Sequence, residues 1–469
     1  MNQGRCATIP PVNVTQRLAE FVAGTSSEAI GPEARAQAKR AVLDTIGVML
    51  AGCREPAAAL VAEHAREQGG REEATVVGAG FRATAEQAAL VNGTAAHALD
   101  YDDVTLNMRG HPSAPLVPAI LALGEKLGAS GRDVLDSYVL GFEAECKLGR
   151  AIGEPHYALG WHATSTLGTL GAAAACARLL RLDTERTRDA LGIAAALASG
   201  LQQNFGTMTK PLHAGWAAHN GVLAAGLAGG GFEANAEAIE GPSGFLRAMS
   251  GGVGIDATAA VRGLGEPWEV VEPGIGVKVY PCCYAIARSI DAALQVRSAV
   301  RSQDVSAVEV VVSPGTLIPL RREVPAGGLE AKFNLEYCVA TALIDGRVGL
   351  EAFRDETLAR REDVRALAAR IAVREAGEQL NFPIEGRAEV RVTVNGIAHS
   401  AEVAVPHGDP KNPLTWDDLA GKFRDCAGTV LPADRVEAAI GLLSRLDELR
   451  DTRALLAAIG GIAEADLTA

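Results

Sequence analysis

Residues 390–405 read VRVTVNGIAHSAEVAV, and this stretch decides the fold class of the second half of the chain. Valines alternate with polar residues before Asn395-Gly396, and apolar residues alternate with polar ones again after that pair. Asn-Gly favours a type I′ turn because both positions need positive φ angles. Alternation with period two on both sides of the turn predicts a β-hairpin with one buried face.

Outward from this hairpin, the chain mixes strands with helices. The run Val308–Val312 is β-branched apart from Glu309, as in a mostly buried strand. Helical spacing of apolar residues occurs at about 284–298, 333–345 and 362–371. The region therefore has the pattern of an α+β domain.

The first half of the chain is predicted to be helical. Pro32 suits the first turn of a helix, and Gly52 suits its end. Thr84 and Gln87 have capping-box spacing at the start of a helix that runs toward His97. Further helices are expected near 14–22, 116–127, 135–146, 164–180 and 188–202, and again after residue 410.

These patterns predict a mainly α protein with an inserted α+β domain. The expected division is a helical domain over 1–266, an α+β lid domain over 267–405, and C-terminal helices over 406–469 that return to the first domain. A length of 469 residues is enough for two or three domains.

Composition excludes several classes of protein. The formal net charge is −13, and aromatic residues make up only 4% of the chain, which argues against binding to nucleic acid or to an anionic membrane surface. No apolar run reaches the ~18 residues of a membrane span. Eight scattered cysteines do not form a disulfide framework. We therefore expect a soluble, cytoplasmic protein with reduced thiols.

One glycine motif suggests a nucleotide-binding loop and is rejected. Gly78-Ala79-Gly80 follows a short apolar run, and Asp100 lies about 20 residues further on. A dinucleotide-binding fold needs a second strand that ends at the acidic residue, and the stretch 94–100 is rich in alanine without a β-branched run. No nicotinamide cofactor is therefore predicted.

The segment 97–113 has the highest density of reactive side chains. It contains His97, Asp100, His111 and further carboxylates directly after a predicted helix. Such a loop can carry acid and base groups into a pocket. The alternative is a solvated acidic turn in which Asp100 or Asp102 caps the next helix. Asp and His also suit a metal, but no ligand spacing typical of a metal site occurs here.

Two further segments place a His or a Lys at the start of a small-residue helix. His162 precedes a run of hydroxyl residues, where it either contributes to a site or simply caps the helix. Lys210 and His213 flank Pro211 and lie between alanine-rich stretches in which charge is scarce. Most lysines are solvated, so the surroundings of Lys210 are what single it out.

The last segment, 276–283, joins a cation to two cysteines. Lys278 lies in a short apolar stretch, and Cys282 and Cys283 are adjacent. Neighbouring cysteines rarely form a strain-free disulfide, so small packing side chains are the favoured interpretation. Lysines, imidazoles and a carboxylate together suit a polycarboxylate substrate and proton transfer at the carbon next to one carboxylate.

At these segments the sequence resembles the MmgE/PrpD family, which includes 2-methylcitrate dehydratases, cis-aconitate decarboxylases and iminodisuccinate epimerases. The resemblance follows the family's order over essentially the whole chain. It is carried by Asn92-Gly93, His97–Asp103, Gly110–Ser113, His162–Gly168, Thr209–His213 and Lys278–Cys283, and more weakly by Ala331–Leu335 and Gly408–Pro413.

The resemblance implies a large helical domain with an α+β lid, a homodimer, a pocket between the domains, and no metal or organic cofactor. The matching positions imply five catalytic residues, which are Asp100, His111, His162, Lys210 and Lys278. Substrate contacts are expected from Thr105, His213, Tyr280 and Cys283.

The sequence also departs from the decarboxylase branch of the family. Val104 stands where that branch has a Thr, although Thr105 is adjacent, and Cys283 stands where it has a His. Ala287 replaces a His found in many members. We therefore expect a cofactor-independent lyase of the dehydratase type that acts on a di- or tricarboxylate. Epimerisation, decarboxylation of cis-aconitate and a catalytically silent carboxylate-binding protein are the alternatives.

Overall fold

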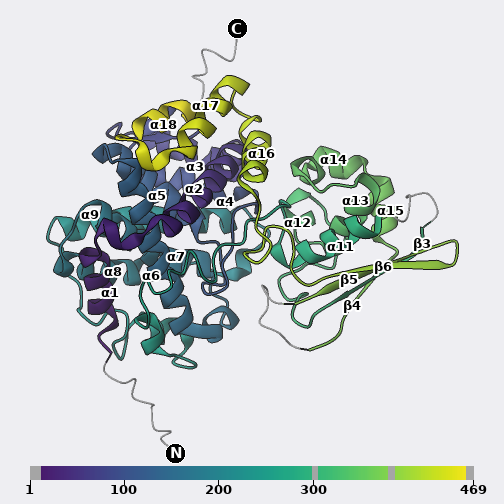
Figure 1. Ribbon diagram of the computed structural model, residues 1–469, viewed down its shortest axis with the longest axis horizontal. Coiled ribbons are helices and arrows are strands. Elements are labelled where there is room, and N and C mark those ends of the chain that lie inside the picture. Colours follow the sequence, from purple (N-terminus) through teal and green to yellow (C-terminus); the bar gives the residue numbers. More distant parts are fainter. Residues whose placement is uncertain (1–11, 298–304, 379–385, 461–469) are drawn as a thin grey trace, which may run out of the picture. The chain divides into compact units, whose positions relative to one another are not determined.

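The computed structural model describes residues 12–297, 305–378 and 386–460, and the chain divides into two compact units (Figure 1). The helical unit comprises residues up to Ala98, then Asn107–Ile275, and then the chain from Trp416. The α+β unit comprises Leu99–Leu106 and Gly276–Thr415. The predicted fold class, mainly α with an α+β insertion, is confirmed.

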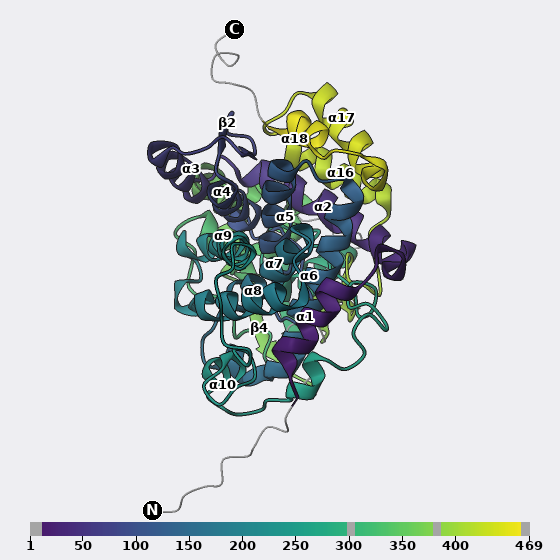
Figure 2. The ribbon, with the colours of Figure 1, turned by 90° about the vertical axis from the view of Figure 1, so that its left-hand side faces the viewer.

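The helical unit is built around helix α7, which packs against α5, α6, α8 and α9 (Figure 2). Small residues dominate α7, and nearly all of them are buried, so neighbouring backbones approach closely. The helices are α1 (Val14–Gly24), α2 (Pro32–Gly52), α3 (Pro56–Gln68), α4 (Ala85–Ala98), α5 (Ser113–Leu127), α6 (Gly131–Ala158), α7 (Ala163–Leu179), α8 (Thr184–Leu197), α9 (Thr209–Gly229), α10 (Phe245–Ser250), α16 (Trp416–Ala427), α17 (Ala433–Ser444) and α18 (Arg453–Ile459).

Several helix ends follow from local sequence. Helix α2 begins at Pro32 and ends at Gly52, as predicted. Thr84 and Gln87 make the reciprocal capping contacts at the start of α4, because the Gln87 amide donates to Thr84 Oγ1 and the Thr84 amide donates to Gln87 Oε1, both at 3.3 Å. Each contact satisfies a backbone N–H that the helix itself leaves without a partner.

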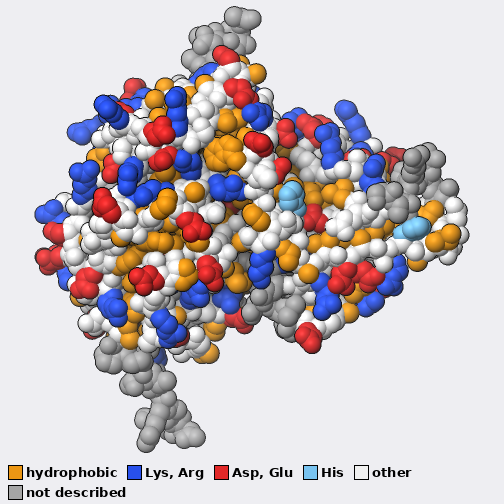
Figure 3. All heavy atoms as spheres, viewed as in Figure 1, with side chains coloured by type: hydrophobic (Ala, Val, Ile, Leu, Met, Phe, Trp, Pro, Cys, Tyr) orange, Lys and Arg blue, Asp and Glu red, His pale blue; other side chains and the backbone are white. Residues whose placement is uncertain are grey.

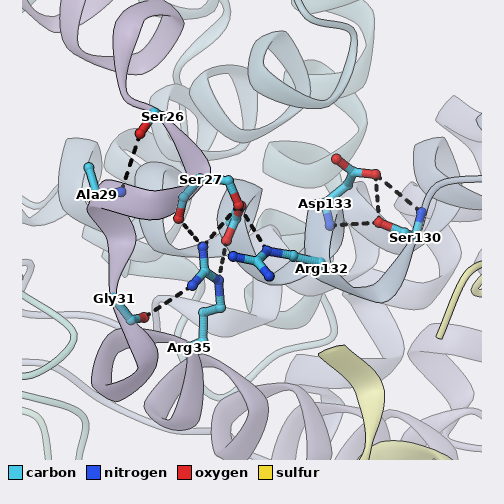
Figure 4. A network of polar contacts seen from close by, with 9 residues as sticks. Ser26, Ser27, Ala29, Gly31, Arg35, Ser130, Arg132 and Asp133 are labelled. Carbon is cyan, nitrogen blue, oxygen red and sulfur yellow. Dashed lines mark hydrogen bonds and ion pairs between the residues drawn. The ribbon is translucent and has the colours of Figure 1, made fainter. Parts of the chain in front are cut away.

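The start of α6 is fixed by a second polar network (Figure 4). Ser130 caps the helix, with its hydroxyl accepting from the Asp133 amide at 3.1 Å. One turn later Asp136 accepts from Arg35 of α2 at 2.6 Å and from the Ser27 hydroxyl at 2.5 Å. Because Asp136 is only 4% exposed, this ion pair links α2 to α6 in a mostly buried setting.

The α+β unit contains one four-stranded sheet of order β4-β3-β5-β6. Strand β3 pairs parallel to β4 and antiparallel to β5, and β5 pairs antiparallel to β6. The predicted hairpin is present, with positive φ angles of 50° at Asn395 and 77° at Gly396. The strands are β3 (Val305–Val312), β4 (Ile371–Glu375), β5 (Ala388–Val394) and β6 (Ile397–Val403), and the helices are α11 (Ala287–Arg297), α12 (Gly328–Ala331), α13 (Leu335–Asp345), α14 (Asp355–Arg360) and α15 (Glu362–Ala368).

The two faces of this sheet differ in chemistry. Helix α11 packs on β5 and β6, where Val390 and Val392 are buried (Figure 1). On the other face Glu309 accepts from Arg374 at 2.8 Å and from Arg391 at 3.0 Å. This alternation of apolar and charged positions is what the period-two pattern of the sequence predicts.

The structure differs from the sequence-based expectations in three places. The helix expected at 362–371 ends at Ala368, and residues 371–375, where no strand was expected, form β4, because Ile371 pairs with Val308 in the parallel ladder. The boundaries between the units lie in the chain at 275/276 and 415/416 instead of 266/267 and 405/406. Residues 99–106 also belong to the α+β unit. The stretch 267–275 stays with the helical unit because Glu269 pairs there with Lys147 at 3.2 Å.

The Gly78-Ala79-Gly80 motif forms a turn between β1 (Ala74–Val76) and β2 (Phe81–Ala83), which pair antiparallel. Both glycines have positive φ angles, 72° and 71°. A tight hairpin of this kind is not the strand-to-helix loop that binds a dinucleotide. The rejection of a nucleotide-binding motif therefore agrees with the local geometry.

The charged side chains of the surface and the cysteines of the described residues agree with what the composition indicates. Basic and acidic side chains are interspersed over the face of the helical unit seen in Figure 3. None of the seven cysteines in the described ranges forms a disulfide there, while Cys6 lies outside those ranges. Within the described part of the chain, no single helix is long and apolar enough to cross a membrane. The pair α2 and α3, bent by 84°, passes only on combined length and composition.

Candidate active site

Four imidazoles gather inside the helical unit, and we call His97, His111, His162 and His213 the histidine cluster. The ring of His97 lies 4.6 Å from that of His111 and 5.5 Å from that of His162, measured between centroids. The rings of His162 and His213 are 5.3 Å apart, and their Nδ1 atoms are 3.1 Å apart. Sequence positions from 97 to 213 thus meet in one place.

Close helix packing creates this cluster. A Cβ on Gly93 of α4 would lie 2.7 Å from Gly215 Cα, and a Cβ on Gly215 would lie 2.2 Å from the Leu90 carbonyl oxygen. Real Cβ atoms do not approach other atoms so closely, so only glycine fits at this crossing of α4 and α9. His97 follows Gly93 by about one turn, and His213 precedes Gly215 by two residues, so the crossing brings both toward His162.

His111 is positioned by the start of α7. Its backbone N–H donates to Thr164 Oγ1 at 3.1 Å. The preceding residue, Gly110, packs so closely that a Cβ there would lie 2.9 Å from the Thr164 amide nitrogen. The loop that carries His111 is therefore held against the N-terminus of α7, next to His162.

His162 occupies the N-cap position of α7 but does not cap the helix with its side chain. Its ring instead contacts His213, while its backbone N–H donates to Gly200 O at 3.0 Å. A hydrogen bond between two Nδ1 atoms requires that one ring carries the hydrogen and the other does not. The capping alternative for this side chain is therefore wrong.

Lys210 reaches the cluster through an aromatic ring. Its ammonium lies 5.5 Å from the centroid of the Phe205 ring, and that ring contacts His162 edge-on at 4.9 Å. Lys210 is only 6% exposed, whereas most lysines are solvated at the surface. The helical unit therefore provides a buried cation beside its imidazoles.

Burial and this cation keep His162 and His213 uncharged. Burial, together with the neighbouring His97, Lys210, His213 and His111, lowers the pKa of His162 well below its ordinary value. Burial and Lys210 lower the pKa of His213 to about 4. At neutral pH both rings are uncharged, which is the form in which an imidazole accepts a proton.

The α+β unit holds the other predicted catalytic residues. The segment 99–106 pairs with the beginning of the longer piece of this unit, 276–415. Val104 and Gly276 exchange two backbone hydrogen bonds of 2.8 Å. The Tyr101 hydroxyl donates to the Val279 carbonyl at 3.0 Å. The pairing places Asp100 beside Lys278.

Asp100 and Lys278 form a buried ion pair. The Lys278 ammonium lies 3.1 Å from the Asp100 carboxylate and donates to the Asp100 carbonyl oxygen at 2.8 Å. Although burial opposes it, the carboxylates of Asp100 and Asp102 raise the pKa of Lys278. Asp100 also has a φ of 52°, a left-handed conformation that is uncommon outside glycine. Asp100 is therefore a constrained partner of Lys278 rather than a solvated helix cap.

A second buried lysine acts on the same turn. The Lys332 ammonium donates to the Leu99 carbonyl oxygen, one residue before the carbonyl that Lys278 binds. It lies 5.4 Å from the centroid of the Phe353 ring, and Lys332 is only 4% exposed. Two ammonium groups thus hold consecutive carbonyls of the turn at Asp100.

The remaining predicted residues of this unit are also largely buried. Thr105 lies beside the Val104 bridge and is 2% exposed. The Tyr280 hydroxyl donates to Asp291 at 2.5 Å. Burial, with the nearby Asp100 carboxylate, raises the pKa of Cys283 to about 12, so this thiol is protonated at neutral pH. Cys283 is therefore present as a neutral thiol, and a thiol is a much weaker nucleophile than a thiolate.

Neither unit by itself assembles a metal site from its described residues. In the helical unit, His97 and His111 are close to each other, but no third metal-binding side chain of that unit completes a group with them. Protein sites for zinc use three or four ligands, so two imidazoles alone fall short.

The structure brings the predicted residues together within each unit. His111, His162, Lys210 and His213 meet in the helical unit, and Asp100 meets Lys278 in the α+β unit. Sequence reasoning assigned no role to Phe205 or Lys332 and treated His97 only as part of a motif. The sequence nevertheless held a signal for two of these residues. His97 begins the same segment as Asp100, and Lys332 lies in a weaker stretch of the family resemblance.

Comparison with known proteins identifies the family. The family model of the MmgE/PrpD N-terminal domain matches residues 16–258, and that of the C-terminal domain matches residues 280–448. The chain therefore belongs to the MmgE/PrpD family, as the sequence resemblance indicated.

Individual relatives cover nearly the whole chain. The cis-aconitate decarboxylase of Homo sapiens is 28% identical over 462 residues, which cover 96% of this chain and 95% of that protein. The cis-aconitate decarboxylase of Aspergillus terreus is 28% identical over 474 residues, which cover 94% of this chain and 95% of that protein. Both relatives are enzymes, as their names state.

Proposed function

We propose that this protein is a lyase that removes water from a di- or tricarboxylic acid, without a metal or an organic cofactor. The observation that carries the proposal is the histidine cluster, in which the uncharged rings of His162 and His213 lie beside the buried cation of Lys210. Such a set suits the transfer of a proton at the carbon next to a carboxylate, because base and charge stabilisation are both supplied.

The chemistry begins with removal of a proton from the carbon next to one carboxylate. The electron pair of that C–H bond forms the new C=C bond, and the hydroxyl on the adjacent carbon leaves as water after taking a proton from an acid. His111 and His162 are the candidates for base and acid. In the tautomer in which His162 donates from Nδ1, its Nε2 is an acceptor, as a general base requires.

The negative charge of a bound substrate is expected to change the strength of His162 as a base. The pKa of His162 is low while only cations and imidazoles surround it. A bound polycarboxylate adds negative charge, which raises the pKa of a nearby imidazole toward neutrality and makes it a stronger base. Lys210 supplies the positive charge that binds a carboxylate in this unit, and Lys278, held by Asp100, supplies it in the α+β unit.

Decarboxylation is the second candidate, because the fungal and human relatives described above are named cis-aconitate decarboxylases. The same residues would then stabilise the carbanion left when CO2 departs, and an acid would protonate that carbon. Cys283 stands where the decarboxylase branch has a His, and its thiol is a poor acid at neutral pH because its pKa is about 12. This difference favours dehydration.

Incubation in D2O with cis-aconitate and a panel of hydroxylated di- and tricarboxylates separates the candidates. Alkene absorbance with loss of water supports the proposal. Release of CO2 assigns decarboxylation instead. Deuterium exchange next to the carboxylate with neither alkene nor CO2 assigns an epimerase. Binding of these acids in calorimetry without any turnover assigns a carboxylate-binding protein. Each of the last three outcomes overturns dehydration.

A matched pair of lysine variants provides the control for this experiment. Lys210→Met removes the buried cation and is expected to abolish turnover. Lys126→Met removes a cation of α5 that is paired with Glu73 at the surface, and turnover should stay within about twofold, as for most surface substitutions. Equal turnover in the two variants would remove Lys210 from the site.

A further inference from the structure

His97 is the member of the histidine cluster to which sequence reasoning gave no role. It is 1% exposed and lies in the last turn of α4. Its ring stacks on His162 at an interplanar angle of 25° and meets His111 nearly edge-on at 62°. His97 therefore lies against both proton-transfer candidates at once.

The backbone that carries His97 is held on two sides. Gly93 crosses Gly215 of α9 at the close approach described above. On the other side, a Cβ on Gly52 of α2 would lie only 2.1 Å from the Ala95 carbonyl oxygen. Helix α4 is thus wedged between α2 and α9 within one turn of His97. A ring attached to so constrained a backbone has little freedom to shift.

The chemistry of His97 is unusual for a position that needs only filling. A buried polar ring carries a desolvation penalty that an apolar side chain of similar size avoids. Alanine dominates the buried part of α4 on either side of it. Among the neighbouring side chains that depress the pKa of His162, His97 has the largest effect, ahead of Lys210, His213 and His111.

We propose that His97 is a positioning residue, which holds the rings of His111 and His162 at fixed angles to its own ring. The inference rests on the proposed function, since it assumes that His111 and His162 transfer the proton. Loss of this alignment is expected to affect the chemical step. Misaligned bases lower kcat, whereas KM depends on the cations that bind carboxylates.

The test uses two variants and one control. His97→Phe keeps a planar ring of similar size without nitrogens, so the fold is expected to survive, and His97→Asn keeps a polar group without the ring. The control is His64→Asn on the exposed face of α3, where His64 contacts only Gln68 among its described hydrogen bonds. Thermal unfolding of all three establishes that they are folded.

The first measurement is the NMR titration of the imidazole signals, which needs no substrate. In both His97 variants the titration midpoint of His162 is expected to rise, because the side chain that most depresses it is removed, and the His111 signals are expected to shift. In His64→Asn both titrations should match the unaltered protein. Unchanged His111 and His162 titrations in a folded His97→Phe protein overturn the inference.

The second measurement is kinetic, with the substrate identified by the D2O experiment. We expect kcat to fall by at least about tenfold in both His97 variants, a small part of what general acid–base catalysis contributes, with KM changed less than about threefold. A rise in KM with unchanged kcat overturns the inference. If no acid is turned over at all, the proposed function fails, while the titration still decides the role of His97.

Discussion

Lys332 shows how a single buried charge can shape a site without being predicted to belong to it. Together with Lys278 it binds two consecutive carbonyls, and between them the chain adopts a left-handed conformation at Asp100. A non-glycine residue in that conformation costs about 1 kcal/mol or more, so it persists only where surrounding contacts impose it.

Lys332→Met is therefore expected to destabilise the protein by about 1–3 kcal/mol, because the buried Leu99 carbonyl loses a charged donor. Turnover should fall as well, since the turn that presents Asp100 is loosened. Chemical denaturation and steady-state rates measure the two effects. Lys411→Met, an exposed lysine of the same unit, should change neither. A Lys332→Met protein with normal stability and turnover would contradict this role.

Buried histidines make the stability of the protein sensitive to acid. Burial lowers the pKa values of His156 and His213 to about 4. The unfolded chain binds protons at these residues near pH 6.5 while the folded chain does not, so folding stability falls as the pH drops from about 6.5 to 4. Each such residue contributes up to about 1.4 kcal/mol per pH unit in that window.

His156→Asn tests this directly, because His156 contacts Thr166 outside the histidine cluster. Its unfolding free energy should depend less steeply on pH between 6.5 and 4, whereas the exposed His64→Asn should keep the full slope. Glu143 has the opposite effect on the pH dependence of stability. Burial raises its pKa to about 7, so the folding stability that it contributes is lost as the pH rises from 4.5 to 7. Parallel pH curves for His156→Asn and the unaltered protein would refute the assignment.

At the scale of elements, the crossing of α4 and α9 controls the histidine cluster. Gly215→Ala places a methyl group against the Leu90 carbonyl of the neighbouring helix, and the helices must separate. We expect a loss of about 1–3 kcal/mol in stability and a loss of turnover, because His213 lies on the displaced helix. Thermal unfolding and rate measurements report both.

The same helix offers the matched control. Gly226 lies on α9, where a methyl group added at this position would have nothing within 4 Å, so Gly226→Ala should be neutral or stabilising by up to about 1 kcal/mol. If the two alanine variants behaved alike, close packing at Gly215 would not be what holds α4 and α9 together.

Much of the secondary structure was predictable because its signals are local. The proline and glycine that bound α2, the capping box of α4 and the Asn-Gly turn act through neighbouring backbone groups. Strand β4 was missed because its five residues gain their strand character from pairing with β3, a contact that no local pattern records. Likewise, sequence indicated reactive histidines in separate segments but could not show that glycine crossings stack their rings.

At the scale of the whole molecule, the net charge of −13 bears on association. The family resemblance predicts a homodimer, and two such chains repel each other at long range. Added salt screens this repulsion, with a Debye length of about 10 Å at 0.1 M. Sedimentation should therefore give about twice the 48.6 kDa of one chain, with tighter association at higher salt. A mass of one chain at every salt concentration would reject the dimer.

The segment 99–106 limits how this protein can be recombined with a relative. It belongs to the α+β unit by its contacts, although helical-unit residues precede and follow it in the chain. An exchange of 276–415 with a relative would pair a foreign Lys278 and Lys332 with the native turn at Asp100. Recombination at the visible boundaries therefore splits one set of contacts between two parents, and a working chimera must transplant two separate pieces of chain together.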